Sequence, residues 1–233
     1  MSTIAIIAAM PPEIHDLALA LANVQEERFR HLRILRGEYG AHELLVIESG
    51  IGKVNAAIAT AHVIARHQPR AVINTGSAGG LGQNVHIGDV VIASHTAHHD
   101  VDVRAFGYAM GQVPQMPERY AADPDLGTAA VIAASHFEDA NVHHGLIVSG
   151  DQFIDHGDKV ARIRADFPEV LAVEMEAAAI AQTCHQLGTP CVIIRAISDH
   201  ADEQAELSFD EFVAQAGHQS ARMVLALVAA LER

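Results

Sequence analysis

Tryptophan is absent from the sequence, and only 4% of its 233 residues are aromatic. Proteins that hold single-stranded nucleic acids stack bases on aromatic side chains, and this composition offers few platforms of that kind. Positive charge is also scarce, since 15 Lys and Arg residues stand against 29 Asp and Glu residues and give a formal net charge of -14. Such a charge repels phosphate backbones and anionic lipids. We therefore expect neither nucleic acid nor a membrane as a partner.

Cysteine is nearly absent as well. The two cysteines, Cys184 and Cys191, are too few for a disulfide framework and are typical of a reduced cytosolic protein. The apolar run at residues 4–9 is too short to span a bilayer, and no basic segment of the kind found in signal peptides precedes it. We expect a cytoplasmic protein.

Apolar runs alternate with helical patterns along the whole chain. Half of the residues are hydrophobic and 19% are charged, which is typical of a globular protein with a sizeable core. Continuous apolar runs at residues 3–10, 71–75, 144–149 and 189–199 predict buried strands, and segments between them have helical spacing. No repeat or linker interrupts the pattern. We predict one α/β domain over residues 1–233, with three α/β/α layers and a mixed, twisted central sheet.

Glycine-rich segments follow two of the predicted strands. Residues 49–53, Ser-Gly-Ile-Gly-Lys, precede a predicted helix at 54–66, and residues 76–80, Gly-Ser-Ala-Gly-Gly, follow the strand at 71–75. Glycine lets a ligand approach the backbone, and helix N-termini favour anions. Residues 49–53 have neither the glycine spacing of a dinucleotide fingerprint nor that of a P-loop, so we do not expect a bound dinucleotide there. A tight loop that needs glycine dihedrals is the alternative for residues 76–80.

Acidic residues stand at the ends of several predicted strands. Glu13 follows the first strand, Asp199 ends the last, and Glu174 and Glu176 flank Met175 where a strand meets an alanine-rich helix. In extended backbone, Glu174 and Glu176 face one side and Met175 the other. Carboxylates also suit the first turn of a helix, so a purely structural role is open for each. Carboxyl groups that meet at one sheet edge suit cleavage of a glycosidic bond, where one activates water and another protonates the leaving group.

Three further patterns lie outside these acids. His95, His98 and His99 match no zinc-binding spacing, so we predict no metal there. The segment at 103–116 carries Phe106, Tyr108 and Pro114 among glycines, and apolar groups in a long loop indicate a lid or a subunit contact. In the C-terminal part, the Ser208 and Glu211 spacing predicts a capping box at the start of the last helix.

Eight short segments occur in one register between residue 3 and the C-terminal region: Met10–Glu13, Ser49–Val54, Asn74–Gly80, His99–Val103, Ala105–Tyr108, Ser149–Asp151, Val173–Ala177 and Arg195–Asp199. Together they resemble the 5′-methylthioadenosine/S-adenosylhomocysteine nucleosidases, which belong to the purine nucleoside phosphorylase superfamily. A set of this extent is far more specific than any single motif. One departure is Pro11-Pro12, where the family usually has acidic residues.

The resemblance implies an enzyme that hydrolyses the N-glycosidic bond of an adenine nucleoside in methionine salvage, without a cofactor. Glu13 is implied to activate the attacking water. Asp199, held by Ser198, is implied to protonate N7 so that adenine leaves neutral. Glu176 is implied to bind the ribose hydroxyls, and Met175 to lie under the sugar.

The resemblance also implies how the remaining substrate contacts are divided. Phe153 would stack on adenine, although a core role is open for it, and Ile154 would read the edge of the base. Ser77 and Arg195 would help to position water. Ala78, Gly79 and Glu174 are implied to contact the substrate as well. An apolar pocket for the 5′ substituent would be formed by Met10, Ile51 and Phe209. A second copy in a homodimer would complete this pocket with Val103, Phe106 and Pro114.

Two other functions compete with hydrolysis. A nucleoside phosphorylase of the same fold would need cationic or dense N–H donors for phosphate, but the glycine segments contain few arginines and Glu13 would repel a dianion. A nonenzymatic nucleoside-binding protein is the second alternative, since fold does not imply function. A mere binder would not need both Glu13 and Asp199. The sequence leaves methylthioadenosine, S-adenosylhomocysteine, 5′-deoxyadenosine and aminodeoxyfutalosine as candidate substrates.

Overall fold

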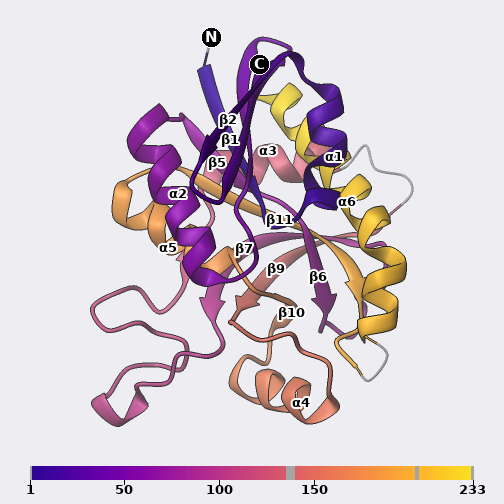
Figure 1. The fold of residues 1–233 in the computed structure, drawn as a ribbon. Helices are drawn as coiled ribbons and strands as arrows, with labels where there is room; N and C mark the ends of the chain where they lie inside the picture. Colours follow the sequence, from indigo (N-terminus) through magenta and orange to yellow (C-terminus); the bar gives the residue numbers. More distant parts are fainter. Residues whose placement is uncertain (1, 135–139, 203–204, 232–233) are drawn as a thin grey trace.

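A computed structural model describes residues 2–134, 140–202 and 205–231 (Figure 1). Its strands form one mixed sheet in the order β2-β3-β4-β1-β5-β11-β6-β10-β9-β7-β8. The strands are β1 (Ser2–Ala8), β2 (Ala22–Phe29), β3 (Leu32–Tyr39), β4 (His42–Glu48), β5 (Ala71–Asn74), β6 (Ser77–Gly80), β7 (Val90–His98), β8 (Tyr120–Ala121), β9 (Val142–Ser149), β10 (Val170–Glu174) and β11 (Cys191–Asp199). The helices are α1 (Pro11–Ala20), α2 (Lys53–His67), the short 3₁₀ helix η1 (Arg104–Phe106), α3 (Pro124–Ala134), α4 (Gly157–Asp166), α5 (Ala177–Leu187) and α6 (Ala205–Ala230).

Helices cover both faces of the sheet, as the alternation along β1 illustrates. Ile4 and Ile6 pack in one core with α1, α3 and α6, whereas Ala5 and Ile7 pack in a second core with α2 and α5. All four side chains are fully buried. Successive side chains of a strand point to opposite faces, so a continuous apolar run is what a strand between two helical layers requires. The predicted three-layer α/β fold with a mixed sheet is confirmed.

The sheet also closes on part of itself. β11 pairs in parallel with β5 and β6 and antiparallel with β7. Because β6, β10, β9 and β7 are linked side by side, this last pairing joins β11, β6, β10, β9 and β7 into a ring. The closure brings strand ends that are distant in the chain to one place, where the candidate site lies.

Several elements differ from the sequence predictions. Residues 77–80, for which a tight glycine loop was the alternative, form β6, in the middle of the sheet between β11 and β10. Ser208 does not cap the last helix, because α6 is already helical from Ala205. The sequence pattern also missed β2, an exposed polar edge strand, and α4, in which only Val160 and Ile163 are buried. Among the described residues, no helix has the length and apolarity needed to cross a bilayer.

Candidate active site

A cavity of about 320 Å³ opens where β1, β6, β10 and β11 end. Its volume lies in the range of small-molecule sites. The residues that line it come from seven separate parts of the chain: Ala9, Met10, Glu13, Ile51, Ser77, Ala78, Gly79, Gln152, Phe153, Ile154, Val173, Glu174, Met175, Glu176, Ser198, Asp199 and Phe209.

Glu13 lies in the first turn of α1 and is only 1% exposed. One carboxylate oxygen, Oε2, accepts hydrogen bonds from the backbone N–H groups of Ala9 (3.0 Å) and Met10 (3.1 Å). The other, Oε1, accepts from the backbone N–H and the hydroxyl of Ser77, both at 2.9 Å. Glu13 therefore caps its helix and also lines the cavity, so capping does not remove it from the candidate site. Pro11 and Pro12 form the start of the helix and do not displace Glu13.

Asp199 ends β11 and is 3% exposed. Its Oδ2 accepts a hydrogen bond from the Ser198 hydroxyl at 2.8 Å, and its Oδ1 accepts one from the Ala201 N–H at 2.8 Å. Burial raises the pKa of Asp199 above its ordinary value, against the effect of these two donors. The protonated carboxyl form, which can donate a proton, is thereby favoured.

Glu174 lines the cavity, and both of its carboxylate oxygens accept hydrogen bonds from the protein. Oε2 accepts from the N–H groups of Glu176 and Ala177, both at 2.9 Å, at the start of α5. The Ser149 hydroxyl donates to Oε1, and Arg195 Nη2 donates to Oε2. With its oxygens engaged in this way, Glu174 is suited to hold other groups in place.

Arg195 is the cation at the centre of this acidic cluster, and it is 1% exposed. It donates to Asn74 Oδ1 at 2.8 Å and to Glu176 Oε2 at 3.4 Å, besides Glu174. Burial alone would lower the pKa of Arg195, but the neighbouring carboxylates, Glu174 foremost, raise it. The guanidinium stays charged and offsets the buried negative charge.

Glu176 lines the cavity, and its negative charge is less well compensated by Arg195 than that of Glu174. Burial, followed by the charge of Glu174, raises the pKa of Glu176 above its ordinary value, while Arg195 opposes the shift. Its Oε1 accepts a hydrogen bond at 2.9 Å from the N–H of Gly52 at the start of α2. Within the described residues, the oxygen Oε2 has only the long contact with Arg195, so Glu176 keeps acceptor capacity for a ligand hydroxyl.

The N-terminus of α2 is already occupied by acidic side chains of the protein. Gly52 donates to Glu176, and the Lys53 N–H donates to Asp151 Oδ1 at 2.8 Å. The Lys53 ammonium pairs with Asp100 at 2.6 Å, whose other oxygen accepts from the Asp151 N–H at 3.0 Å. The Gly52 and Lys53 N–H groups, which could otherwise bind an external anion, are thus used by internal carboxylates.

Two glycines permit the close contacts around the acids. Gly76 has φ +144°, and a Cβ atom there would lie 2.7 Å from Glu13 Oε1 and even closer to Arg195. At Gly79, a Cβ atom would lie 2.9 Å from Asp199 Oδ1. Any larger residue would have to displace a carboxyl group of the site.

Comparison with known proteins agrees with this geometry. Residues 3–229 match the family described as the Phosphorylase superfamily. A 5′-methylthioadenosine/S-adenosylhomocysteine nucleosidase of Exiguobacterium sp. is 48% identical over 230 residues, covering 99% of each chain. The chain belongs to this nucleosidase family.

Solved structures of the nucleosidase family superimpose closely on this fold. The Neisseria meningitidis nucleosidase in complex with methylthio-immucillin-A has a TM-score of 0.96 at 56% identity, with 98% of this chain and 99% of that chain covered. A futalosine hydrolase mutant of Helicobacter pylori has a TM-score of 0.93 at 31% identity, with 98% and 99% covered. Solved proteins of this fold thus carry the names of more than one substrate.

An aromatic pair, Phe153 and Phe209, forms part of the cavity wall. The rings of Phe153 and Phe209 meet edge to face, with centroids 5.9 Å apart and planes at 76°. Phe153 is 40% exposed and is therefore not an ordinary core residue. Its exposed ring is available to a flat ligand.

The structure brings together all but four of the residues that the sequence predicted for the site. Arg195 does not line the cavity but lies behind Glu174 and Glu176. Met175 does line it, so the strict alternation predicted for Glu174, Met175 and Glu176 is wrong, because β10 ends at Glu174 and the backbone turns into α5. Sequence reasoning missed Ala9, Gln152 and Val173, each of which is next to a predicted site residue.

The other three, Val103, Phe106 and Pro114, lie in the segment between β7 and β8 and do not line this cavity. Figure 1 shows the segment extending away from the body of the domain at the lower left, with η1 at its tip. Phe106 is 82% exposed and Pro114 is also exposed, whereas Tyr108, which was expected to be exposed, is partly buried.

The histidines at the end of β7 have separate surroundings. His95 is exposed, and His98 Nε2 contacts Gln182 Oε1 at 2.8 Å. His99 is buried against Gly150. In the described part of the chain, the one group of metal-ligating side chains lies elsewhere, at Glu27, His62 and His67.

Proposed function

We propose that this protein hydrolyses the N-glycosidic bond of 5′-methylthioadenosine and S-adenosylhomocysteine and releases adenine. The observation that carries the proposal is the unlike environment of two carboxyl groups in one cavity. Glu13 is surrounded by four donors, whereas burial raises the pKa of Asp199. A carboxylate held by donors suits a general base, and a carboxyl group whose pKa is raised by burial suits a general acid.

In the proposed reaction, the oxygen of a water molecule attacks the anomeric carbon, and Glu13 takes a proton from that water. The bond between this carbon and N9 breaks as Asp199 donates a proton to N7, so adenine leaves as a neutral base. Ser198 holds Asp199 through the hydroxyl contact described above. Ser77 orients Glu13 and, with it, the water, while Arg195 contributes by holding Glu174 and Glu176.

The remaining lining residues are proposed to bind the substrate. Glu176 accepts hydrogen bonds from the ribose hydroxyls, and Met175 lies under the sugar. Phe153 stacks on adenine, and backbone groups of Ile154 read its edge. Ala78 and Gly79 of β6 supply further contacts to the substrate. Met10, Ile51 and Phe209 form the apolar pocket for the 5′ substituent.

Hydrolysis is favoured over phosphorolysis by the charges at the site. No lysine or arginine is found among the described residues that line the cavity. Two N–H groups at the start of α2, those of Gly52 and Lys53, donate to Glu176 and Asp151. Purified protein should release adenine from methylthioadenosine in phosphate-free buffer, with a free sugar product. A phosphorylated sugar, or a rate that rises with phosphate, would support the phosphorylase instead, and no release of adenine would support a binding protein.

We further propose that two copies form a homodimer, in which Val103, Phe106 and Pro114 of one copy complete the 5′ pocket of the other. The support is the exposure of Phe106 and the extension of its segment from the domain. Exposed apolar groups of this kind usually mark an interface. A lid that folds back on its own chain is the alternative.

The cellular setting and the substrate range complete the proposal. We propose that the chain acts as one domain in the cytoplasm, which its two unpaired cysteines support. The candidate substrates share adenine and ribose and differ at the 5′ end. Values of kcat/KM for methylthioadenosine, S-adenosylhomocysteine, 5′-deoxyadenosine and aminodeoxyfutalosine would identify the preferred substituent.

A further inference from the structure

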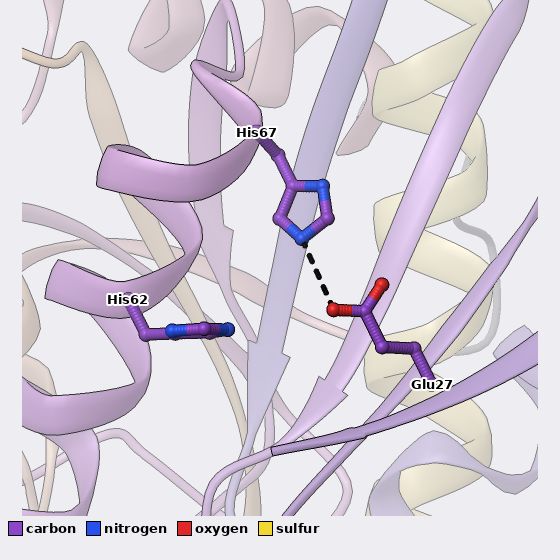
Figure 2. A group of neighbouring side chains, drawn as sticks. All are labelled: Glu27, His62 and His67. Carbon is purple, nitrogen blue, oxygen red and sulfur yellow. Dashed lines mark ion pairs between the residues drawn. The ribbon is translucent and has the colours of Figure 1, made fainter.

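Three potential metal ligands converge between the edge strand β2 and helix α2, as Figure 2 shows. His62 and His67 come from the last turns of α2, and Glu27 comes from β2. One ligand atom from each residue lies within 4.8 Å of the others. His67 Nε2 and Glu27 Oε1 are 3.9 Å apart, which is too far for a hydrogen bond.

The two imidazoles have unused nitrogen atoms. The Nε2 atoms of His62 and His67 are both buried, and neither has a hydrogen-bond partner within the described chain. A buried polar atom left unsatisfied costs about 1–3 kcal/mol. A cation between the rings would give both nitrogens a partner.

The ring of His62 is held in place by an aromatic neighbour. Phe29 stacks on it with centroids 3.9 Å apart and planes at 9°. Glu27 and Phe29 are two residues apart on β2 and so face the same side of the strand. The strand therefore presents a carboxylate and a ring-orienting side chain to the same part of α2.

We propose that Glu27, His62 and His67 bind a zinc ion, with water as the fourth ligand. Two histidines and one carboxylate are an established ligand set for zinc, with bonds of about 2.0–2.2 Å. In a tetrahedron of that size, the ligand atoms are about 3.4 Å apart, so the side chains need to close by no more than about 1.4 Å. The Glu27 side chain is 42% exposed and the His67 side chain 12%, which gives the ion a path from solvent.

The site would join β2, at the edge of the sheet, to the C-terminal end of α2. This end lies about 20 Å along the helix from the start of α2 at the cavity, at 1.5 Å per residue. The nearby Arg36 is paired with Glu43 at 2.6 Å, so its charge is compensated. The proposed ion is structural and takes no part in the reaction.

The experiment measures zinc binding by the full chain without a polyhistidine tag, after treatment with a chelator. Zinc is titrated against a chromogenic competitor, and Co²⁺ absorption reports the coordination geometry. We expect one zinc per chain, tetrahedral Co²⁺ bands and a higher Tm with zinc. Glu27→Gln, His62→Gln and His67→Gln should each weaken binding by at least about tenfold.

Matched controls are needed because the sequence contains 16 histidines. His15 and His95 are exposed and lie outside the cluster, so His15→Gln and His95→Gln should leave zinc affinity unchanged. Circular dichroism establishes that each variant is folded. The proposal is overturned if the native chain binds no zinc at tens of micromolar, or if binding persists unchanged in folded variants of the cluster.

Discussion

Ser77 donates two hydrogen bonds to a single oxygen of Glu13, one from its backbone and one from its hydroxyl, each 2.9 Å long. The residues are 64 positions apart and meet because β6 lies inside the sheet beside β11. Together with the two N–H groups on the other oxygen, they fix the orientation of the carboxylate. Four donors around one carboxylate also explain why an amide would be a poor replacement.

Replacing Glu13 by glutamine should remove the proposed base and place an amide NH₂ against N–H donors. We expect turnover to fall by about 10²-fold or more, with binding of an adenine nucleoside less affected. Adenine release and calorimetric binding measure the two effects. Glu38→Gln, at an exposed position on β3, is the matched control and should retain full turnover. Turnover near that of the native protein in Glu13→Gln would remove Glu13 from the mechanism.

Asp199→Asn should also lower turnover by about 10²-fold or more, because an amide cannot donate the required proton. The variant carries a second signature in stability. Since the pKa of Asp199 is raised in the folded state, the native protein should lose stability as pH rises from the unfolded pKa through the folded one. Denaturant unfolding of Asp199→Asn between pH 4 and 8 should lack that contribution. The same pH dependence in both proteins would contradict the protonated role.

Arg195→Met should destabilise the protein by about 3–5 kcal/mol, because it leaves Glu174 and Glu176 without their buried cation. The matched control is Arg28→Met, since Arg28 pairs with Glu26 on the surface and its side chain is 70% exposed. Such an exposed pair contributes little to stability. Urea unfolding of both variants tests the difference, and equal losses would mean that Arg195 is not the counterion of the cluster.

Phe106→Asp should weaken the proposed dimer and raise KM together, because one surface would serve both functions. Sedimentation and steady-state kinetics at matched protein concentrations report the two effects. Leu19→Asp is a suitable control, because Leu19 is 73% exposed on α1 and lies outside the extended segment. A native protein that is fully active as a monomer would exclude the dimer and favour the lid.

The sequence by itself determined the layers of the fold and the acids that meet at the cavity, whereas its resemblance to the nucleosidases supplied most of the other residues of the cavity wall. Continuous apolar runs mark strands that helices cover on both faces, as Ile4 to Ile7 illustrate. Acids at the ends of such runs, notably Glu13 and Asp199, are carried to the same sheet edge by the topology. These properties follow from the local period of a strand and from where each strand stops.

Tertiary structure alone decided which ionisable groups from distant parts of the chain lie next to one another. Nothing near Arg195 in the sequence shows that its guanidinium lies behind Glu174 and Glu176, because that position depends on how β11 pairs with its neighbours. Strand β2 is polar and shows no alternation of apolar residues, so its sequence does not predict its partners. Glu27 and His62 are brought together only because α2 packs beside β2. A local pattern records which face a residue occupies, whereas strand register and helix packing determine what that face meets.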